Sequence, residues 1–236
     1  MGVFTSGSGR RSRSLSSVLG GIAVVGASAL VLAGCAPAES EEPAGPTEEL
    51  SLKIGTILPQ SGALAFLGPP EEAGVALAVQ DINEADLGIT VEAIYRDSGD
   101  TTTDTATVSV TDLLSQNVSA IVGAASSGVS FTVIDQIVGA GVVHFSPANT
   151  SPNFTTYDDN GLYWRTAPSD LLQGEVLGNL IAEDGAATLG MLVLNDAYGT
   201  GLAAALAATF AAAGGEAVEE HLFNAGATSF DAQLSA

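Results

Sequence analysis

The feature that most restricts the fold is an alternation of two sequence patterns that starts near residue 50. Short apolar runs rich in β-branched residues are each followed by a longer segment with the pattern of a helix. A strand–helix–strand order of this kind predicts a parallel sheet covered by helices on both faces. The runs IVG and MLVL are apolar throughout, so we expect these strands to be buried on both sides.

These patterns place the expected elements along the chain. Strands are predicted at Leu52–Leu58, Ile89–Tyr95, Ala120–Val122, Val142–Phe145, Leu162–Arg165, Thr188–Leu194 and Ala217–Phe223. Helices are predicted at Pro70–Ala85, Thr103–Gln116, Ser130–Gly139, Leu171–Glu183 and Thr200–Ala213. The fold class is therefore α/β.

Two loops of small polar residues follow predicted strands, namely GAASSG (123–128) and SPANTSP (146–152). Parallel α/β sheets bind ligands beyond the carboxyl ends of their strands, which is where both loops lie. This position favours a binding role for the loops over a bare surface role.

The side chains in these loops suit a ligand with one anionic end and one cationic end. Ser126 and Ser127 stand between a strand and a helix, where free backbone N–H groups attract a carboxylate. Thr150 adds a hydroxyl, and the carbonyl of Ala148 can accept a hydrogen bond from an ammonium group. The residues alone leave an alternative open, in which the serines cap a helix and residues 149–152 form a turn.

Catalytic sites are poorly supported by the sequence. His144 and His221 lie in predicted strands, and neither has a second histidine at metal-ligand spacing. GAASSG is similar to a nucleophile elbow and to a dinucleotide-binding loop, but it lacks the glycine spacing that either requires. We therefore expect no enzymatic activity, no catalytic residues, no metal and no cofactor.

The N-terminal segment has the layout of an export signal. Arg10, Arg11 and Arg13 precede an apolar run of small residues that ends in Leu-Ala-Gly-Cys. This ending resembles the bacterial lipobox, so residues 1–34 are predicted to be a lipoprotein signal peptide and Cys35 the lipidated residue. Because Cys35 is the only cysteine, the chain cannot form an internal disulfide. The alternative is a transmembrane helix with an incidental cysteine.

The segment after the signal and the overall charge are typical of a protein surrounded by solvent. Residues 35–50 are rich in Ala, Pro and Glu and are predicted to form a flexible acidic tether. The chain has 6 Lys and Arg against 27 Asp and Glu, a net charge of −21. Nucleic acid is an unsuitable partner, because its binding needs basic patches.

Five motifs in order along the chain resemble one family. They are IGTILPQSGALAFLG (54–68), IVGAASSGV (121–129), FSPANTSPNFT (145–155), WRTAPSDLLQG (164–174) and LNDAYGTGL (194–202). They are similar to the motifs of ABC-transporter substrate-binding proteins of the branched-chain amino acid (Leu/Ile/Val-binding) type. The resemblance implies the type I periplasmic binding protein fold, with two α/β lobes that close on a ligand. The first lobe would span residues 51–166, and residues 167–236 would form part of the second.

The resemblance also implies roles for residues of the first lobe. The family's carboxylate-binding serine corresponds to Ser127, with Ser126 beside it. The residues that surround the ligand's α-ammonium and α-carboxylate correspond to Ala148 and Thr150. A side chain of the first loop that faces the cleft falls near Leu67.

In the second lobe, the family's tyrosine that closes over the ligand corresponds to Tyr198. The acidic residue that pairs with the ammonium in the family would lie beyond Ala236. Since family members are also substantially longer, we expect the second lobe to be incomplete and the chain to be C-terminally truncated.

The function implied by the resemblance is solute capture outside the cytoplasm. The protein would be anchored to the membrane by the lipid on Cys35 and would deliver an amino acid to an ABC permease and ATPase. The alternative is a ligand-sensing domain of the same fold that acts on a signalling partner.

Overall fold

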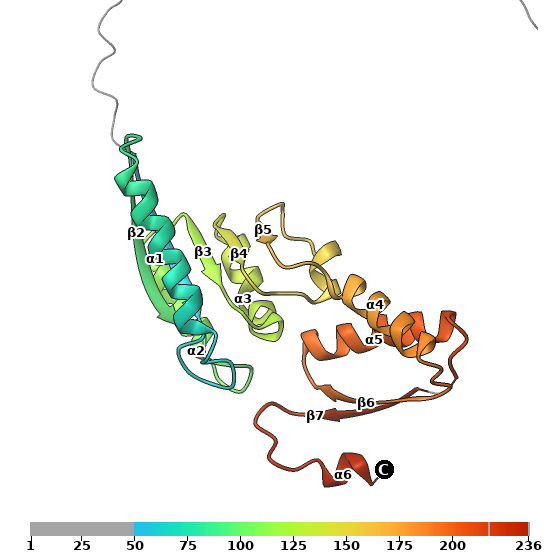
Figure 1. The fold of residues 1–236 in the computed structure, drawn as a ribbon. Coiled ribbons are helices and arrows are strands. Elements are labelled where there is room, and N and C mark those ends of the chain that lie inside the picture. The colour runs from blue at the N-terminus through green and yellow to red at the C-terminus, as the bar shows by residue number, and fades with distance from the viewer. Residues whose placement is uncertain (1–49, 217, 236) are drawn as a thin grey trace, which may run out of the picture. The chain divides into compact units, whose positions relative to one another are not determined.

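The computed structural model describes residues 50–216 and 218–235, and the fold is α/β as the sequence predicts. Its strands are β1 (Leu50–Leu58), β2 (Ile89–Asp97), β3 (Ala120–Gly123), β4 (Val143–Ser146), β5 (Tyr163–Arg165), β6 (Leu189–Leu194) and β7 (Val218–Phe223). Its helices are α1 (Gly68–Glu84), α2 (Thr105–Ser115), α3 (Ser127–Gly139), the 3-10 helix η1 (Pro152–Thr156), α4 (Asp170–Glu183), α5 (Ala197–Ala212) and α6 (Asp231–Leu234). Figure 1 shows this order from blue to red.

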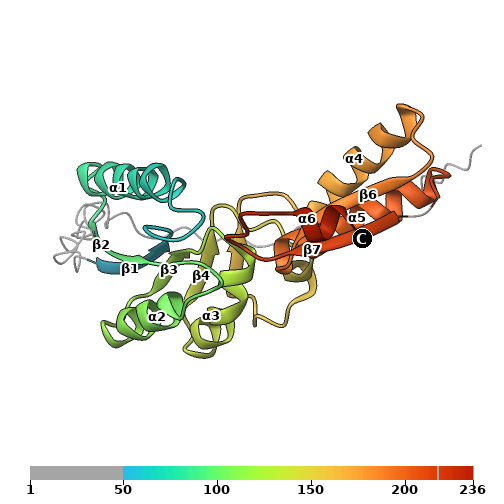
Figure 2. The same ribbon diagram turned by 90° about the horizontal axis from the view of Figure 1, so that it is seen from below.

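The first five strands form one parallel sheet in the order β2-β1-β3-β4-β5. Helix α1 lies on one face of this sheet, and α2 and α3 lie on the other (Figure 2). Ile57 of β1 and Ile121 of β3 pack against Val110 and Leu113 of α2 and Val133 of α3, all fully buried. We call this sheet and its helices the first lobe.

Strands β6 and β7 form a second, two-stranded parallel sheet, which we call the second lobe together with α4, α5 and α6. Helices α4 and α5 lie on one side of these strands and α6 on the other (Figure 1). Leu192 of β6 and Leu222 of β7 are 45% and 42% exposed. The expectation that MLVL would be buried on both sides is therefore wrong for Leu192, because the large helices α4 and α5 cover a single face of this sheet.

Two local differences from the predicted elements bear on function. Helix α3 begins at Ser127 rather than Ser130, because the hydroxyl of Ser126 caps its first turn. Ser126 and Ser127 thus belong to the start of this helix. Helix η1 was not expected, since its sequence PNFTT has the composition of a loop.

Several predictions concern residues outside this description. The signal peptide at 1–34, the lipidated Cys35 and residues 35–49 of the tether lie outside the described residues, and residue 50 already belongs to β1. Within residues 50–216 and 218–235, no helix combines the length and apolarity needed to cross a membrane. The predicted lobe boundary at 166/167 lies between β5 and α4, and it stays a prediction.

Candidate ligand-binding site

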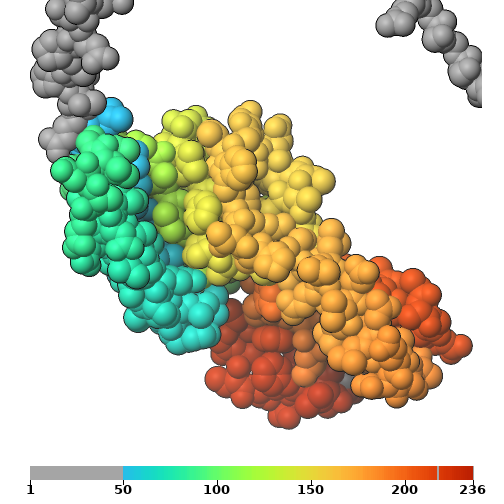
Figure 3. All heavy atoms as spheres, turned by 45° about the horizontal axis from the view of Figure 1, so that its top comes forward, coloured from blue at the N-terminus to red at the C-terminus, as the bar shows by residue number. Residues whose placement is uncertain are grey.

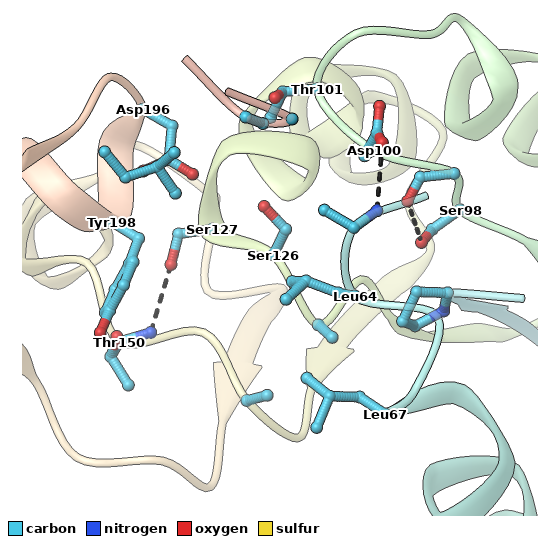
Figure 4. Close-up of a pocket in the computed structure, with 18 of the residues that line it drawn as sticks. Leu64, Leu67, Ser98, Asp100, Thr101, Ser126, Ser127, Thr150, Asp196 and Tyr198 are labelled. Carbon is cyan, nitrogen blue, oxygen red and sulfur yellow. Dashed lines mark hydrogen bonds between the residues drawn. The ribbon is translucent and has the colours of Figure 1, made fainter. Parts of the chain in front are cut away.

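One pocket of about 500 Å³ lies at the carboxyl ends of the first-lobe strands, where the second lobe adds further lining residues. Small-molecule sites in proteins have volumes of roughly 300 to 1,000 Å³. All six residues that the sequence singles out for ligand binding line it: Leu67, Ser126, Ser127, Ala148, Thr150 and Tyr198. Figure 4 labels all of them except Ala148 and shows that they come from separate segments of the chain. Their contact with a ligand stays a prediction.

The apolar wall of the pocket comes largely from the loop between β1 and α1. Pro59, Ala63, Leu64 and Leu67 line the pocket from this loop. The second lobe contributes Phe223, the last residue of β7, and further lining residues after this strand. The space-filling view shows the cyan segment that contains the β1–α1 loop next to the red segment after β7 (Figure 3). This part of the site can accept an apolar group.

The backbone of the β1–α1 loop is held by two aspartates. Asp97 Oδ1 accepts hydrogen bonds from the N–H groups of Gln60 at 2.9 Å and Ser61 at 3.1 Å, and Asp97 Oδ2 accepts one from the Ser61 hydroxyl. Asp100 accepts a hydrogen bond from the N–H of Ala63 at 3.3 Å. Burial raises the pKa of Asp97, but the hydrogen bonds from Ser61, Gly99 and Gln60 outweigh it and bring the pKa below its ordinary value. Both carboxylates therefore act as acceptors for this loop.

The start of α3 presents free hydrogen-bond donors to the pocket. Ser126 Oγ accepts the N–H of Val129 at 3.4 Å, so the hydroxyl caps the helix and keeps its own proton to donate. Among the described residues, the N–H groups of Ser127 and Gly128 have no hydrogen-bond acceptor. Unsatisfied N–H groups at a helix start carry partial positive charge and attract anions. Capping and binding are thus compatible roles for Ser126.

Ser127 joins the two predicted binding loops. It is 2% exposed, and its Oγ accepts hydrogen bonds from the N–H of Thr150 at 3.3 Å and of Ser151 at 3.2 Å. The dashed line in Figure 4 marks the first of these bonds. The hydroxyl proton of Ser127 remains available for donation.

Thr150 is in turn bonded to an acidic residue that sequence reasoning missed. Its hydroxyl donates to Asp170 Oδ2 at 2.7 Å. Asp170 is 1% exposed, and its Oδ1 has no hydrogen-bond partner within the part of the chain that the structure describes. Burial raises the pKa of Asp170, against the opposing effects of the Thr150 hydrogen bond and the charge of Arg165. In the sequence, an acid after Ser169 is simply typical of a helix first turn.

Tyr198 reaches the pocket from the second residue of α5. Asp196 precedes it as the N-cap of this helix and accepts the N–H of Gly199 at 2.8 Å. Burial, and then the negative charges of Asp170 and Asp196, raise the pKa of the Tyr198 hydroxyl. The surroundings of this hydroxyl are therefore negative.

The charged side chains on the pocket lining are all acidic. Asp100 and Asp196 line it, and the described lining contains no lysine, arginine or histidine. His144 is instead buried in the first lobe, with its Nε2 at 2.7 Å from the carbonyl of Gly123. His221 lies on β7 beside Glu219. Residues 50–216 and 218–235 contain no group of three or more His, Cys, Asp or Glu side chains placed to hold a metal ion.

Comparison with known proteins agrees with this architecture. A family model described as "Periplasmic binding protein" matches residues 51–236. The leucine-, isoleucine-, valine-, threonine- and alanine-binding protein of Pseudomonas aeruginosa is 30% identical over 78% of this chain. The chemotactic signal transduction system substrate-binding protein BasB of Halobacterium salinarum is 28% identical over 65% of the chain.

Solved structures share the fold at lower sequence identity. An ABC-transporter solute-binding protein from R. palustris, in complex with 4-hydroxybenzoate, superimposes with a TM-score of 0.70 at 22% identity. The match covers 78% of this chain and 50% of that one. The chain likewise spans about half the length, 50% and 40%, of the two relatives named above. With its family model matched over residues 51–236, the chain belongs to the periplasmic binding protein family, whose named relatives here are binding proteins rather than enzymes.

Proposed function

We propose that this protein captures an α-amino acid outside the cytoplasm and delivers it to an ABC importer. One observation carries the substrate class. The pocket brings N–H donors without acceptors, at the start of α3, together with the hydroxyl of Thr150. This hydroxyl donates to Asp170 Oδ2, while Asp170 Oδ1 has no hydrogen-bond partner among the described residues. These are complementary ends for a zwitterion.

The ligand's carboxylate would bind at the α3 start. The N–H groups of Ser127 and Gly128 and the hydroxyl protons of Ser126 and Ser127 are the donors available there. Backbone amides at a helix start are suited to a carboxylate because they combine hydrogen bonds with the positive end of the helix dipole.

The ligand's ammonium would bind on the Thr150 side of the pocket. The carbonyl of Ala148 and the hydroxyl oxygen of Thr150 are acceptors on this side. Asp170 does not line the pocket, but its carboxylate is bonded to the Thr150 hydroxyl and adds negative charge behind it. Tyr198 would cover the ligand from α5.

The ligand's side chain would lie against the apolar wall. Leu64 and Leu67 of the first lobe and Leu194 and Phe223 of the second supply this wall. Apolar surface of this kind favours an aliphatic side chain, as in the branched-chain amino acids. The name of the Pseudomonas aeruginosa relative supports the same substrate class.

Isothermal titration calorimetry of the protein against the set of L-amino acids tests the proposal. We expect heat with at least one aliphatic amino acid. Thr150→Ala should weaken binding by roughly tenfold to a hundredfold, since a hydrogen bond to a charged group is lost. Thr150→Ser should retain most of the affinity. Thr111→Ala should retain all of it, because it removes a hydroxyl that donates to Thr107 on α2 and accepts from Gln136 on α3, and none of these residues lines the pocket. Absence of heat with every amino acid would rule out the substrate class.

Delivery to an importer and anchoring through Cys35 are further parts of the proposal. Metabolic labelling with radioactive palmitate should mark the wild-type protein and not the Cys35→Ser variant. Deletion of the gene should reduce uptake of the bound amino acid by cells. Unlabelled wild-type protein would refute the anchor without bearing on the pocket.

A signalling role is the second candidate, and the name of the Halobacterium salinarum relative favours it. In this case the same pocket would report the ligand to a partner rather than to a permease. The deletion strain separates the two roles. Loss of amino acid uptake supports transport. Loss of a behavioural or transcriptional response to the amino acid, with uptake unchanged, supports sensing.

A further inference from the structure

Asn149 lies fully buried between the two loops that form the polar end of the pocket. Its Nδ2 donates to the carbonyl of Ala124 at 3.1 Å and to that of Ala125 at 2.9 Å. Its Oδ1 accepts the hydroxyl of Tyr163 at 2.9 Å. One side chain thus bonds the β3–α3 loop to the β4–η1 loop and to β5.

The chemistry of the partners fixes the orientation of this amide. Backbone carbonyls accept hydrogen bonds and cannot donate them, so the NH₂ group of Asn149 has to face Ala124 and Ala125. The remaining oxygen then faces the hydroxyl of Tyr163, which donates to it. Each polar atom of the side chain therefore has a partner of the opposite kind.

A second link runs alongside the first. The N–H of Asn149 donates to Ser146 Oγ at 3.0 Å, and that hydroxyl donates to the carbonyl of Ala124 at 2.7 Å. Backbone and side chain of Asn149 therefore reach the same loop by separate routes. This double connection resists a change in the distance between the two loops.

Both loops carry pocket residues next to the connection. Ala125, which accepts from Asn149, lines the pocket and is followed by Ser126 and Ser127, while Ala148 and Thr150 flank Asn149 itself. We propose that Asn149 is a positioning residue that sets the separation between the α3 start and Thr150. It acts through these neighbours and does not touch the ligand. The inference rests on the proposed function, because it concerns how the two ends of the zwitterion site are held.

Asn149→Asp provides a sharp test. An ionised carboxylate would place negative charge against two carbonyl oxygens, whereas the protonated acid can donate to one of them and still accept from Tyr163. The other groups around the network are Arg165, whose Nη1 lies 3.5 Å from the carbonyl of Asn149, and His144, whose ring contacts Tyr163 and whose pKa is lowered to about 4 by burial. The lowered pKa keeps His144 largely uncharged from about pH 5 to about pH 8.

Asn83 offers a control outside the pocket lining. Its side chain makes two hydrogen bonds, one fewer than that of Asn149: it accepts from the N–H of Val91 at 2.7 Å and donates to the Val91 carbonyl at 3.0 Å. Asn83→Asp therefore disrupts a more exposed side-chain bridge, from α1 to β2, whose residues do not line the pocket. It reports the effect of general destabilisation.

The readouts are calorimetric affinity for L-leucine and the amide NMR signals of residues 124–128 and 150, both followed from about pH 5 to about pH 8. At the upper end of this pH range, we expect Asn149→Asp to bind L-leucine roughly tenfold more weakly than wild type, because a buried carbonyl loses its donor. Its affinity should recover as the pH falls and the carboxyl takes up a proton. Its amide signals should shift over the same range, and Asn83→Asp should show neither effect.

Each outcome decides the proposal. The proposal is overturned if the affinity of Asn149→Asp, relative to wild type, does not change with pH. It is also overturned if this relative affinity equals that of Asn83→Asp. If wild type binds neither leucine nor another amino acid, the proposed function fails, and the positioning role is decided by the amide signals in the ligand-free protein. If Asn149→Asp does not fold, Tyr163→Phe replaces it, with severalfold weaker binding expected at every pH. Wild-type affinity in a folded Tyr163→Phe then counts against the role.

Discussion

Thr150 and Asp170 hold each other by two hydrogen bonds in opposite directions. The Thr150 hydroxyl donates to the Asp170 carboxylate at 2.7 Å, and the Asp170 N–H donates to the Thr150 carbonyl at 2.8 Å. Thr150 belongs to a loop of the first lobe, whereas Asp170 is the first residue of α4. The pair therefore ties a pocket loop to the first helix after the predicted lobe boundary.

Replacing Asp170 by Asn should separate stability from function. Because burial raises the pKa of Asp170, the folded state holds its proton more tightly than the unfolded state, and ionisation at neutral pH costs stability. Asp170→Asn should therefore be more stable by on the order of 1 kcal/mol near neutral pH, and less so in acid. Amino acid binding should weaken, since the negative charge bonded to the Thr150 hydroxyl is lost. Chemical unfolding and calorimetry measure the two effects, with Asp81→Asn on the exposed face of α1 as the control.

The acidic lining should discriminate between ligands by charge. Isocaproate has the skeleton of leucine without the ammonium group, so it would bring a net negative charge to Asp100 and Asp196. We expect it to bind at least roughly a hundredfold more weakly than leucine. Asp196→Asn should narrow this ratio, and asparagine still caps α5. Equal affinity of the wild type for isocaproate and leucine would contradict the prediction, and Asp158→Asn at an exposed position should leave the ratio unchanged.

Gly128, the second residue of α3, lies close to Thr101 and Asp196, and a larger residue should interfere with binding. A Cβ at this position would come within 2.8 Å of Thr101 Cγ2 and 3.3 Å of Asp196 Cβ. Gly128→Ala would thus push apart the first-lobe and second-lobe sides of the pocket, with severalfold weaker ligand binding as the expected result. Gly139→Ala on the same helix meets no atom within 4 Å and should keep full affinity. Loss of affinity in both variants would mean that a general disturbance of α3, and not the contact at Gly128, weakens binding.

Buried His144 should make stability depend on pH. Desolvation lowers its pKa to about 4, against the opposing effect of the hydrogen bond to Gly123. The unfolded chain therefore takes up the proton first, and unfolding becomes easier as the pH falls below about 6.5, by up to ~1.4 kcal/mol per pH unit. Asp170 and Glu71, whose pKa values are raised, act in the opposite direction nearer pH 4. Urea unfolding between about pH 7 and about pH 5 isolates the histidine, and His144→Gln should flatten the slope in this range.

Much of the fold could be predicted because strands and helices of this chain differ clearly in pattern. Each predicted strand and helix of the body corresponds to an observed one, and the parallel order follows from their alternation. The exposure of Leu192 could not be predicted, since a run of apolar residues does not reveal how many faces of its sheet are covered.

The polar site was predictable in part. Position after a strand identified the loops of Ser127 and Thr150, and the family resemblance added Tyr198, which all line one pocket. The sequence did not single out Asp170 or Asn149, because an acid at a helix start and an asparagine in a turn are common for structural reasons alone. What distinguishes them is contact between segments 20 or more residues apart, as between Thr150 and Asp170 or between Asn149 and Ala125.

The β1–α1 loop is fastened by its main chain, since Asp97 and Asp100 accept the N–H groups of Gln60, Ser61 and Ala63. Every amino acid except proline carries that donor. Leu64 and Leu67 can therefore be exchanged for other side chains while the loop keeps its course. A lineage that carries this chain could acquire a new ligand preference by mutations at two codons, with the aspartates that hold the loop left untouched.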